Sequence, residues 1–210
     1  MWILFGCAAV CFGICLPLFR HFKASRPFLG ACFKTLGTLC ALVPALTAAL
    51  KLNSDAWFFV AAICLHAAGD YLLEFWFELG MGAFLLGHLC YIIAFLRLFS
   101  VGLPHLVLSV CFLAFLAVIL YRSKERIGKN LYAFSVYGTV LSLMAACGIS
   151  GGISAFSVQG ALIAIGGSLF IFSDYLLFQR LLFPSGRNLN LAIMITYYLA
   201  QLLLGSSCLF

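Results

Sequence analysis

Long apolar runs alternate with short polar breaks along the whole chain. An α-helix needs about 20 mostly apolar residues to cross the hydrocarbon core of a bilayer, and each run is about that long. The breaks are too short to hold a soluble domain. The pattern therefore predicts eight transmembrane helices, over residues 2–19, 29–50, 56–74, 81–99, 104–121, 131–149, 156–178 and 190–209.

The composition agrees with this pattern. Hydrophobic residues make up 65% of the 210 residues and charged residues 9%, whereas soluble domains average about 45–50% and about 25%. A soluble fold could not cover this much apolar surface. We therefore predict an all-α polytopic membrane protein in which residues 1–210 form a single transmembrane domain. The charges near the first run follow it, at Arg20, Lys23 and Arg26, so we expect a retained span and not a signal peptide.

The distribution of basic residues predicts the orientation, because short cytoplasmic loops are enriched in Lys and Arg. Ten of the twelve basic residues fall at the first, third, fifth and seventh breaks, whereas only Lys51 and Arg97 fall on the other side. The odd-numbered loops are therefore expected in the cytoplasm and both termini on the opposite face. The ten are Arg20, Lys23, Arg26, Lys34, Arg122, Lys124, Arg126, Lys129, Arg180 and Arg187.

The net charge of +6 is thus a signal of topology and of contact with lipid headgroups, and no nucleic-acid partner is expected. We expect an integral multi-pass protein of the bacterial inner membrane, or of the endoplasmic reticulum in a eukaryote. The ten cysteines fall almost entirely within apolar runs, which predicts small packing residues rather than disulfides or metal ligands. The sequence carries no indication of an oligomeric state.

A short internal repeat suggests a four-plus-four arrangement of the helices. Gly69-Asp70-Tyr71-Leu72-Leu73 in the third run matches Ser173-Asp174-Tyr175-Leu176-Leu177 in the seventh. Four spans per half would leave both halves in the same orientation, related by an axis along the membrane normal. A match of five residues is also compatible with coincidence, and the sequence leaves both interpretations open.

Polar side chains inside the predicted spans share one depth. Charged groups within a span are costly and usually face a cavity or a partner. With a rise of about 1.5 Å per residue, six of these side chains fall within a slab roughly 10 Å deep in the cytoplasmic half. We therefore predict one cavity there. The six are Lys34, Asp70, His88, Tyr137, Asp174 and Tyr197.

Three further polar residues lie close to this slab. His66 is one turn deeper than Asp70 on the same helix face, and we interpret it as a packing residue. Glu74 borders the cytoplasmic surface, where solvation by the interface explains it. Gln201 follows Tyr197 at i+4, the spacing of residues that hydrogen-bond across neighbouring helices.

These motifs together resemble the YhhN family of membrane proteins, which includes the lysoplasmalogenases of animals and bacteria. They occur in the order of the family and spread over most of the chain. One departure is that Thr35 follows Lys34, where the family usually has proline. The matching residues are Gly69-Asp70; Phe84, Gly87, His88 and Tyr91; Tyr137 and Met144; Gly167 with Phe170-Ile171-Phe172-Ser173-Asp174; and Tyr197-Tyr198-Leu199-Ala200-Gln201.

The resemblance implies hydrolysis of the vinyl ether bond of a lysophospholipid, with membrane lipids as further partners and without metal or cofactor. Such cleavage requires one protonated acid and one ionised carboxylate, and carboxylates in different environments can fill both roles. The resemblance implies that Asp70, Asp174 and His88 are catalytic. The predicted substrate-binding residues are Lys34, Tyr91, Tyr137, Tyr197 and Gln201.

Three other functions remain open at this point. Asp70, His88 and Asp174 could ligate zinc in a metal-dependent lipid hydrolase. Acidic residues inside a membrane also mark proton-coupled or small-molecule transporters. A non-catalytic lipid-binding or scaffold protein could keep the same fold.

Overall fold

The computed structural model describes residues 2–51, 54–184 and 186–210, and in these residues every regular element is a helix. All eight predicted apolar runs coincide with helical segments. The elements are α1 (Trp2–Val10), the π-helical turn η1 (Cys11–Cys15), α2 (Leu16–Ser25), α3 (Pro27–Leu39), α4 (Leu42–Leu50), α5 (Ala56–Leu72), α6 (Phe77–Leu98), α7 (Leu103–Ile127), the 3-10 turn η2 (Gly128–Asn130), α8 (Leu131–Ser154), α9 (Val158–Leu182) and α10 (Arg187–Ser207).

Two of the predicted spans are composite. α1, η1 and α2 follow one another without a break and form the first rod, Trp2–Ser25. The second predicted span is divided into α3 and α4, which are bent by 43°. Pro44 explains the bend, because its ring lacks an N–H group and clashes with the carbonyl group four residues earlier, at Cys40.

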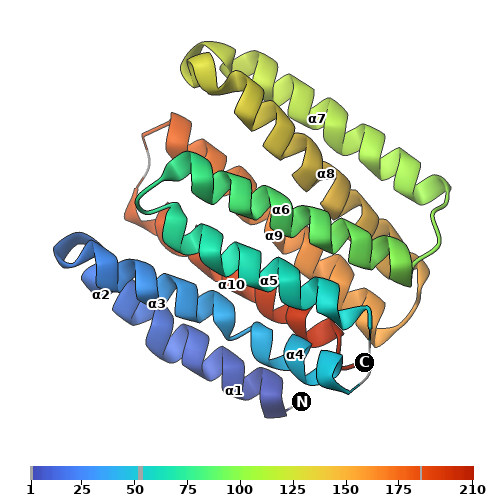
Figure 1. Cartoon of the computed structure of the whole chain (residues 1–210). Coiled ribbons are helices and arrows are strands. Elements are labelled where there is room, and N and C mark those ends of the chain that lie inside the picture. The colour runs from blue at the N-terminus through green and yellow to red at the C-terminus, as the bar shows by residue number, and fades with distance from the viewer. Residues whose placement is uncertain (1, 52–53, 185) are drawn as a thin grey trace.

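The helices form a bundle in which sequence neighbours are mostly antiparallel (Figure 1). α10 is central, since it contacts α9, α5, α4, α3 and α1. α7 is peripheral and packs mainly on α8. Both chain ends lie at one end of the bundle, whereas the connections α2–α3, α5–α6, α7–α8 and α9–α10 lie at the other (Figure 1).

The number of membrane spans is confirmed only in part. Five helical stretches of the described residues are long and apolar enough to cross a bilayer, and the bent pair α3 and α4 brings the number to six. The prediction of eight differs for two reasons. α5 has only 17 residues, and the 52-residue stretch Leu103–Ser154 counts as one candidate although it holds both α7 and α8.

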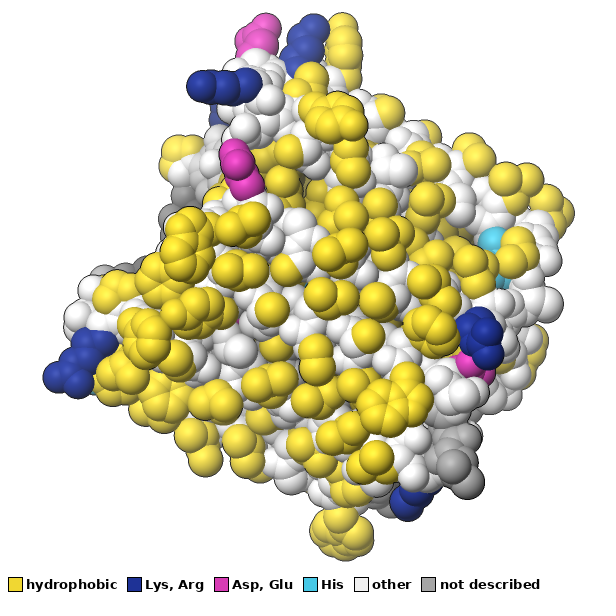
Figure 2. Space-filling view, in the orientation of Figure 1, with side chains coloured by type: hydrophobic (Ala, Val, Ile, Leu, Met, Phe, Trp, Pro, Cys, Tyr) yellow, Lys and Arg dark blue, Asp and Glu magenta, His cyan; other side chains and the backbone are white. Residues whose placement is uncertain are grey.

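The surface has the character expected of a protein embedded in lipid. In the view of Figure 2, hydrophobic side chains cover most of the visible face and the Lys and Arg side chains lie near its margins. Large apolar residues such as Val107, Val110 and Val118 on α7 are half exposed or more. These faces are suited to contact with acyl chains.

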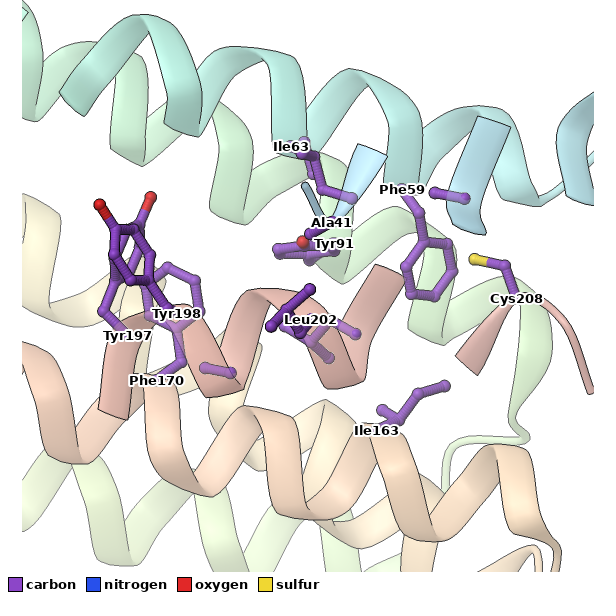
Figure 3. Packing of buried hydrophobic residues seen from close by; sticks show 14 of the residues in the cluster. Ala41, Phe59, Ile63, Tyr91, Ile163, Phe170, Tyr197, Tyr198, Leu202 and Cys208 are labelled. Atoms are coloured by element: carbon purple, nitrogen blue, oxygen red, sulfur yellow. The ribbon is translucent and has the colours of Figure 1, made fainter. Parts of the chain in front are cut away.

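The interior is closely packed by aromatic and small residues. Tyr91, Phe59 and Phe95 form a set of ring contacts between α5 and α6, with centroids 5.6 to 5.9 Å apart. Figure 3 shows Phe170 beside Tyr197 and Tyr198, and the rings of Phe170 and Tyr197 meet edge to face at 5.5 Å. This packing fixes α5, α6, α9 and α10 around the polar residues described next.

Candidate functional site

A cavity of about 880 Å³ opens among the helix ends that lie opposite the termini. Residues of α2, α3, α5, α6, α7, α8, α9 and α10 line it. Its walls differ in chemistry. The basic side chains of Arg20, Lys23 and Arg180 line one part, whereas α7 contributes only apolar side chains. The cavity is therefore amphipathic.

Asp70 is held on one wall of this cavity by three donors. The hydroxyl groups of Thr38 and Tyr197 both donate to its Oδ2 atom, the latter at 2.8 Å. The ammonium group of Lys34 lies 3.6 Å from Oδ1. Hydrogen-bond donors and a cation all stabilise the charged form of a carboxyl group. With its side chain 2% exposed, Asp70 is thus a buried carboxylate with a partner on each oxygen.

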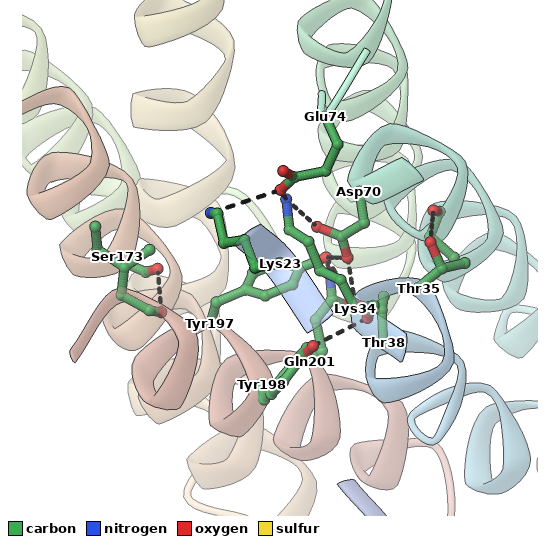
Figure 4. Close-up of polar contacts among 12 residues, drawn as sticks. Lys23, Lys34, Thr35, Thr38, Asp70, Glu74, Ser173, Tyr197, Tyr198 and Gln201 are labelled. Carbon is green, nitrogen blue, oxygen red and sulfur yellow. Dashed lines mark hydrogen bonds and ion pairs between the residues drawn. The ribbon is translucent and has the colours of Figure 1, made fainter. Parts of the chain in front are cut away.

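Lys34 connects Asp70 to a second acid at the end of α5. Its Nζ atom lies 3.1 Å from Oε1 of Glu74, which is in turn 3.9 Å from Nζ of Lys23. Figure 4 shows this series of alternating charges leading from Lys23 to Asp70. Burial raises the pKa of Glu74, but the charges of Lys34 and Lys23 outweigh it and lower the pKa below its ordinary value. Lys34 is consequently shared between two carboxylates.

Asp174 lies on α9 and has a different environment. The hydroxyl group of Tyr137 donates to its Oδ2 atom, and Nε2 of His88 lies 3.9 Å from the same oxygen. Nε2 of His88 also lies 3.2 Å from the Tyr137 hydroxyl oxygen. Oδ1 of Asp174 has no hydrogen-bond partner among the described residues. Asp174 therefore has fewer hydrogen-bond donors than Asp70.

The structure brings together five of the predicted site residues in the cavity lining, namely Lys34, Asp70, Tyr137, Asp174 and Tyr197. The other three are buried behind this lining. His88 contacts Tyr137 as described, and the hydroxyl group of Tyr91 donates to Oε1 of Gln201 at 2.9 Å. The cavity-lining prediction is therefore wrong for His88. The catalytic and binding roles of all eight stay predictions.

Sequence reasoning missed Thr38 and underestimated Glu74 and Lys23. Thr38 follows Lys34 at i+4 and so lies on the same face of α3, a spacing that could have identified it. Glu74 follows Asp70 at the same interval. Lys23 and Arg180 were interpreted only as signals of topology, because their position beside the cavity depends on how α2 and α9 pack.

The residues do not form a recognisable metal site. Within residues 2–51, 54–184 and 186–210, no group of three or more His, Cys, Asp or Glu side chains is arranged to hold a metal ion. Oδ2 of Asp70 is occupied by two hydroxyl donors, and Asp174 is likewise engaged by Tyr137.

Comparison with known proteins gives one match. The family model that fits the chain is that of the YhhN family, over residues 29–208. Neither the curated proteins nor the solved structures contain a match. The matched range includes nearly all of α3, the whole of α4 to α10 and both carboxylates, and leaves out the first rod.

Proposed function

The chain belongs to the YhhN family, and from that premise we propose that it is a lysoplasmalogenase. This family includes such enzymes. The reaction is hydrolysis of the vinyl ether bond of a lysophospholipid, which releases a fatty aldehyde and a glycerophospho-ethanolamine or -choline. The observation that carries the proposal is that Asp70 and Asp174 line one amphipathic cavity with different partners.

The different partners support different roles for the two acids. Asp70 has hydroxyl donors on one oxygen and a lysine beside the other, so it acts as the ionised carboxylate. Asp174 has fewer donors and one oxygen without a protein partner among the described residues, so we assign it the role of the proton donor. A pair of acids whose environments separate their protonation states is a recurring basis for acid–base catalysis.

The proposed reaction has three steps in which atoms and charges balance. Asp174 transfers its proton to the alkene carbon, and an oxocarbenium ion forms at the neighbouring carbon. A water molecule adds to that carbon and gives a proton to Asp70, which yields a hemiacetal. The hemiacetal hydroxyl group then returns a proton to Asp174 while Asp70 protonates the departing glycerol oxygen. Both side chains finish in their starting states.

The shape and charge of the cavity suit a single-chain phospholipid. Arg20, Lys23 and Arg180 provide cations that a phosphate group can approach. On the other side, Leu116 and Ile119 of α7 contribute to an apolar wall that suits an alkenyl chain. Asp70 and Asp174 belong to α5 and α9, which lie between α2 and α7 in the view of Figure 1, as a bond that joins the glycerol to the chain requires.

We further propose that all eight helical rods cross the membrane. α5 has 17 residues, which corresponds to about 25 Å and can span a bilayer core with slight thinning. α7 and α8 contact one another and are joined at Gly128, where φ is +59° and the chain turns. With the positive-inside bias, the cavity then faces the cytoplasm and both termini the opposite side.

The proposal is tested by aldehyde release from a defined lysoplasmalogen by the purified full-length protein in detergent. The matched control substrate is the lysophospholipid with a saturated ether in place of the vinyl ether, which cannot form the oxocarbenium ion by protonation. We expect release from the first lipid only, and undiminished release after treatment with a strong chelator. Absence of turnover by folded protein would refute the proposal, and loss of turnover on chelation would favour the metal-dependent alternative.

A further inference from the structure

We propose that His66 is a positioning residue of the Asp70 carboxylate, which acts through Gln201 and Tyr197. This inference rests on the proposed function for its catalytic consequence, whereas the hydrogen-bond arrangement itself does not depend on it. His66 lies on α5 and is fully buried, and it does not line the cavity. From the sequence, a packing role is the favoured interpretation of this residue.

A backbone carbonyl group determines the tautomer of His66. Nε2 of His66 lies 3.3 Å from the carbonyl oxygen of Phe84. A carbonyl oxygen can only accept a hydrogen bond, so Nε2 must carry the proton. In the neutral ring, Nδ1 is then an acceptor, and it lies 2.9 Å from Nε2 of Gln201. The side-chain amide of Gln201 therefore points its NH₂ group toward His66.

This orientation of Gln201 satisfies both ends of its amide. Its Oε1 atom accepts from the hydroxyl group of Tyr91 at 2.9 Å. Its Nε2 atom also lies 3.4 Å from the hydroxyl oxygen of Tyr197. A flipped amide would place two acceptors together at His66, whereas the Tyr91 hydroxyl group could accept from the amide as well as donate to it. The ring of His66 thus selects one orientation.

The orientation of Gln201 affects Asp70 through the hydroxyl proton of Tyr197. Because Gln201 presents its NH₂ group to Tyr197 at 3.4 Å, and not its carbonyl oxygen, it does not compete for the Tyr197 hydroxyl proton, which is donated to Oδ2 of Asp70 at 2.8 Å. A buried hydroxyl group that donates to a carboxylate stabilises the charged form. His66 therefore helps to keep Asp70 ionised and able to accept a proton from water, although it does not touch the cavity.

The packing around His66 keeps the ring in this position. Gly87 on α6 faces it, and a Cβ atom at that position would lie 2.5 Å from Nε2. The rings of Phe84 and Phe170 both contact it, with centroids 5.0 and 5.1 Å away. A side chain at position 87 would displace the ring from the Phe84 carbonyl group, so the glycine is required by the close approach.

The first part of the test observes the tautomer directly. Nitrogen-15 NMR of histidine-labelled full-length protein, with the His66 signals identified by their loss in His66→Asn, should show a neutral ring protonated at Nε2. In Gln201→Leu the ring should keep this tautomer, because the Phe84 carbonyl group still accepts from Nε2, while the Nδ1 signal shifts on loss of its donor. A ring protonated at Nδ1, or a charged ring at neutral pH, would overturn the proposal whatever lipid the protein hydrolyses.

The second part of the test measures how His66 affects kcat. His66→Leu removes the acceptor for Gln201 and should lower kcat about tenfold with KM changed by less than twofold. His66→Asn offers an amide oxygen near the place of Nδ1 and should restore most of the loss. Ile63→Val, a buried change one turn away on α5, is the matched control for altered packing and should leave kcat unchanged.

The same loss should disappear when Tyr197 cannot donate. In a Tyr197→Phe background, His66→Leu should cause no further decrease in kcat, because residues acting in series are non-additive. A full tenfold loss in that background would overturn the proposal and indicate a general structural effect. A wild-type protein with the expected tautomer but no turnover of lysoplasmalogen would instead refute the proposed function.

Discussion

Tyr197 and Asp70 are 127 residues apart in the chain, yet the hydroxyl group of Tyr197 donates a hydrogen bond of 2.8 Å to Oδ2 of Asp70. The contact joins α10 to α5 at the cavity wall. Asp174, on the neighbouring α9, receives its hydroxyl donor from Tyr137 on α8. Each carboxyl group is thus paired with a tyrosine from another helix, and the remaining partners of the two differ.

We expect Asp70→Asn and Asp174→Asn each to reduce kcat by about a hundredfold or more, because each removes one half of the proton transfer. The double variant should be barely worse than either single one, since residues that act as a unit show non-additive losses. Steady-state aldehyde release and thermal unfolding in detergent provide the two measurements. The matched control is Asp55→Asn, which alters a carboxylate paired with Arg97 outside the cavity. Near-normal turnover of either cavity variant would disprove the pairing.

Lys34 should be required for stability as well as for the site. Lys34→Met leaves Asp70 and Glu74 without their shared cation, and removal of one partner from a buried ion pair costs about 3–5 kcal/mol. Glu74 and Lys34 retain partial contact with the cavity, so we expect about 2 kcal/mol in the free energy of unfolding. Addition of Asp70→Asn to Lys34→Met should recover part of the loss.

The control for this charge effect is Lys51→Met, which changes an exposed lysine beyond the end of α4. Surface changes of this kind usually alter stability by less than about 0.5 kcal/mol. Thermal or denaturant unfolding of the three variants in the same detergent supplies the comparison. Equal stability of Lys34→Met and Lys51→Met would show that the interaction with the acids contributes little.

The orientation prediction is tested with reporter fusions. A reporter at Ser54, between α4 and α5, should report the non-cytoplasmic side, and one at Lys129, between α7 and α8, the cytoplasm. The physical reason is the concentration of Lys and Arg in the odd-numbered loops. The same side for both fusions would overturn the predicted topology, including the proposed crossing by α5, α6 and α7.

The positions of the helices could be predicted from the sequence, because an apolar run of about 20 residues has few alternatives to a transmembrane helix. The bend between α3 and α4 also had a visible cause in Pro44. The shared depth of Asp70 and Asp174 follows from counting residues along helices. Depth alone, however, does not give the direction in which a side chain points.

The contacts that distinguish the two acids were not predictable for that reason. Thr38 reaches Asp70 only because α3 and α5 approach closely there, and His66 reaches Gln201 across 135 residues of sequence. His88 shows the opposite case. Its depth agrees with that of the acids, but its ring is buried behind Tyr137 and does not line the cavity. Such directions depend on the rotation of each helix about its axis, which packing determines.

The apolar wall contributed by α7 should determine which chain lengths are hydrolysed. Ile119 on α7 lines the cavity, so Ile119→Trp should occupy space that a long alkenyl chain would use. We expect kcat/KM for a long-chain lysoplasmalogen to fall about tenfold, equivalent to about 1.4 kcal/mol, while a short-chain analogue is affected less than twofold.

The matched control is Val118→Trp, the adjacent position, which is 52% exposed on the outer surface and absent from the lining. The selectivity between chain lengths, rather than the activity itself, is the informative quantity, because a general folding defect would reduce both rates equally. An equal loss for long-chain and short-chain lipids, or the same effect in Val118→Trp, would show that the alkenyl chain of the lipid does not bind against α7. The basic part of the cavity would then be the remaining proposed contact with the lipid.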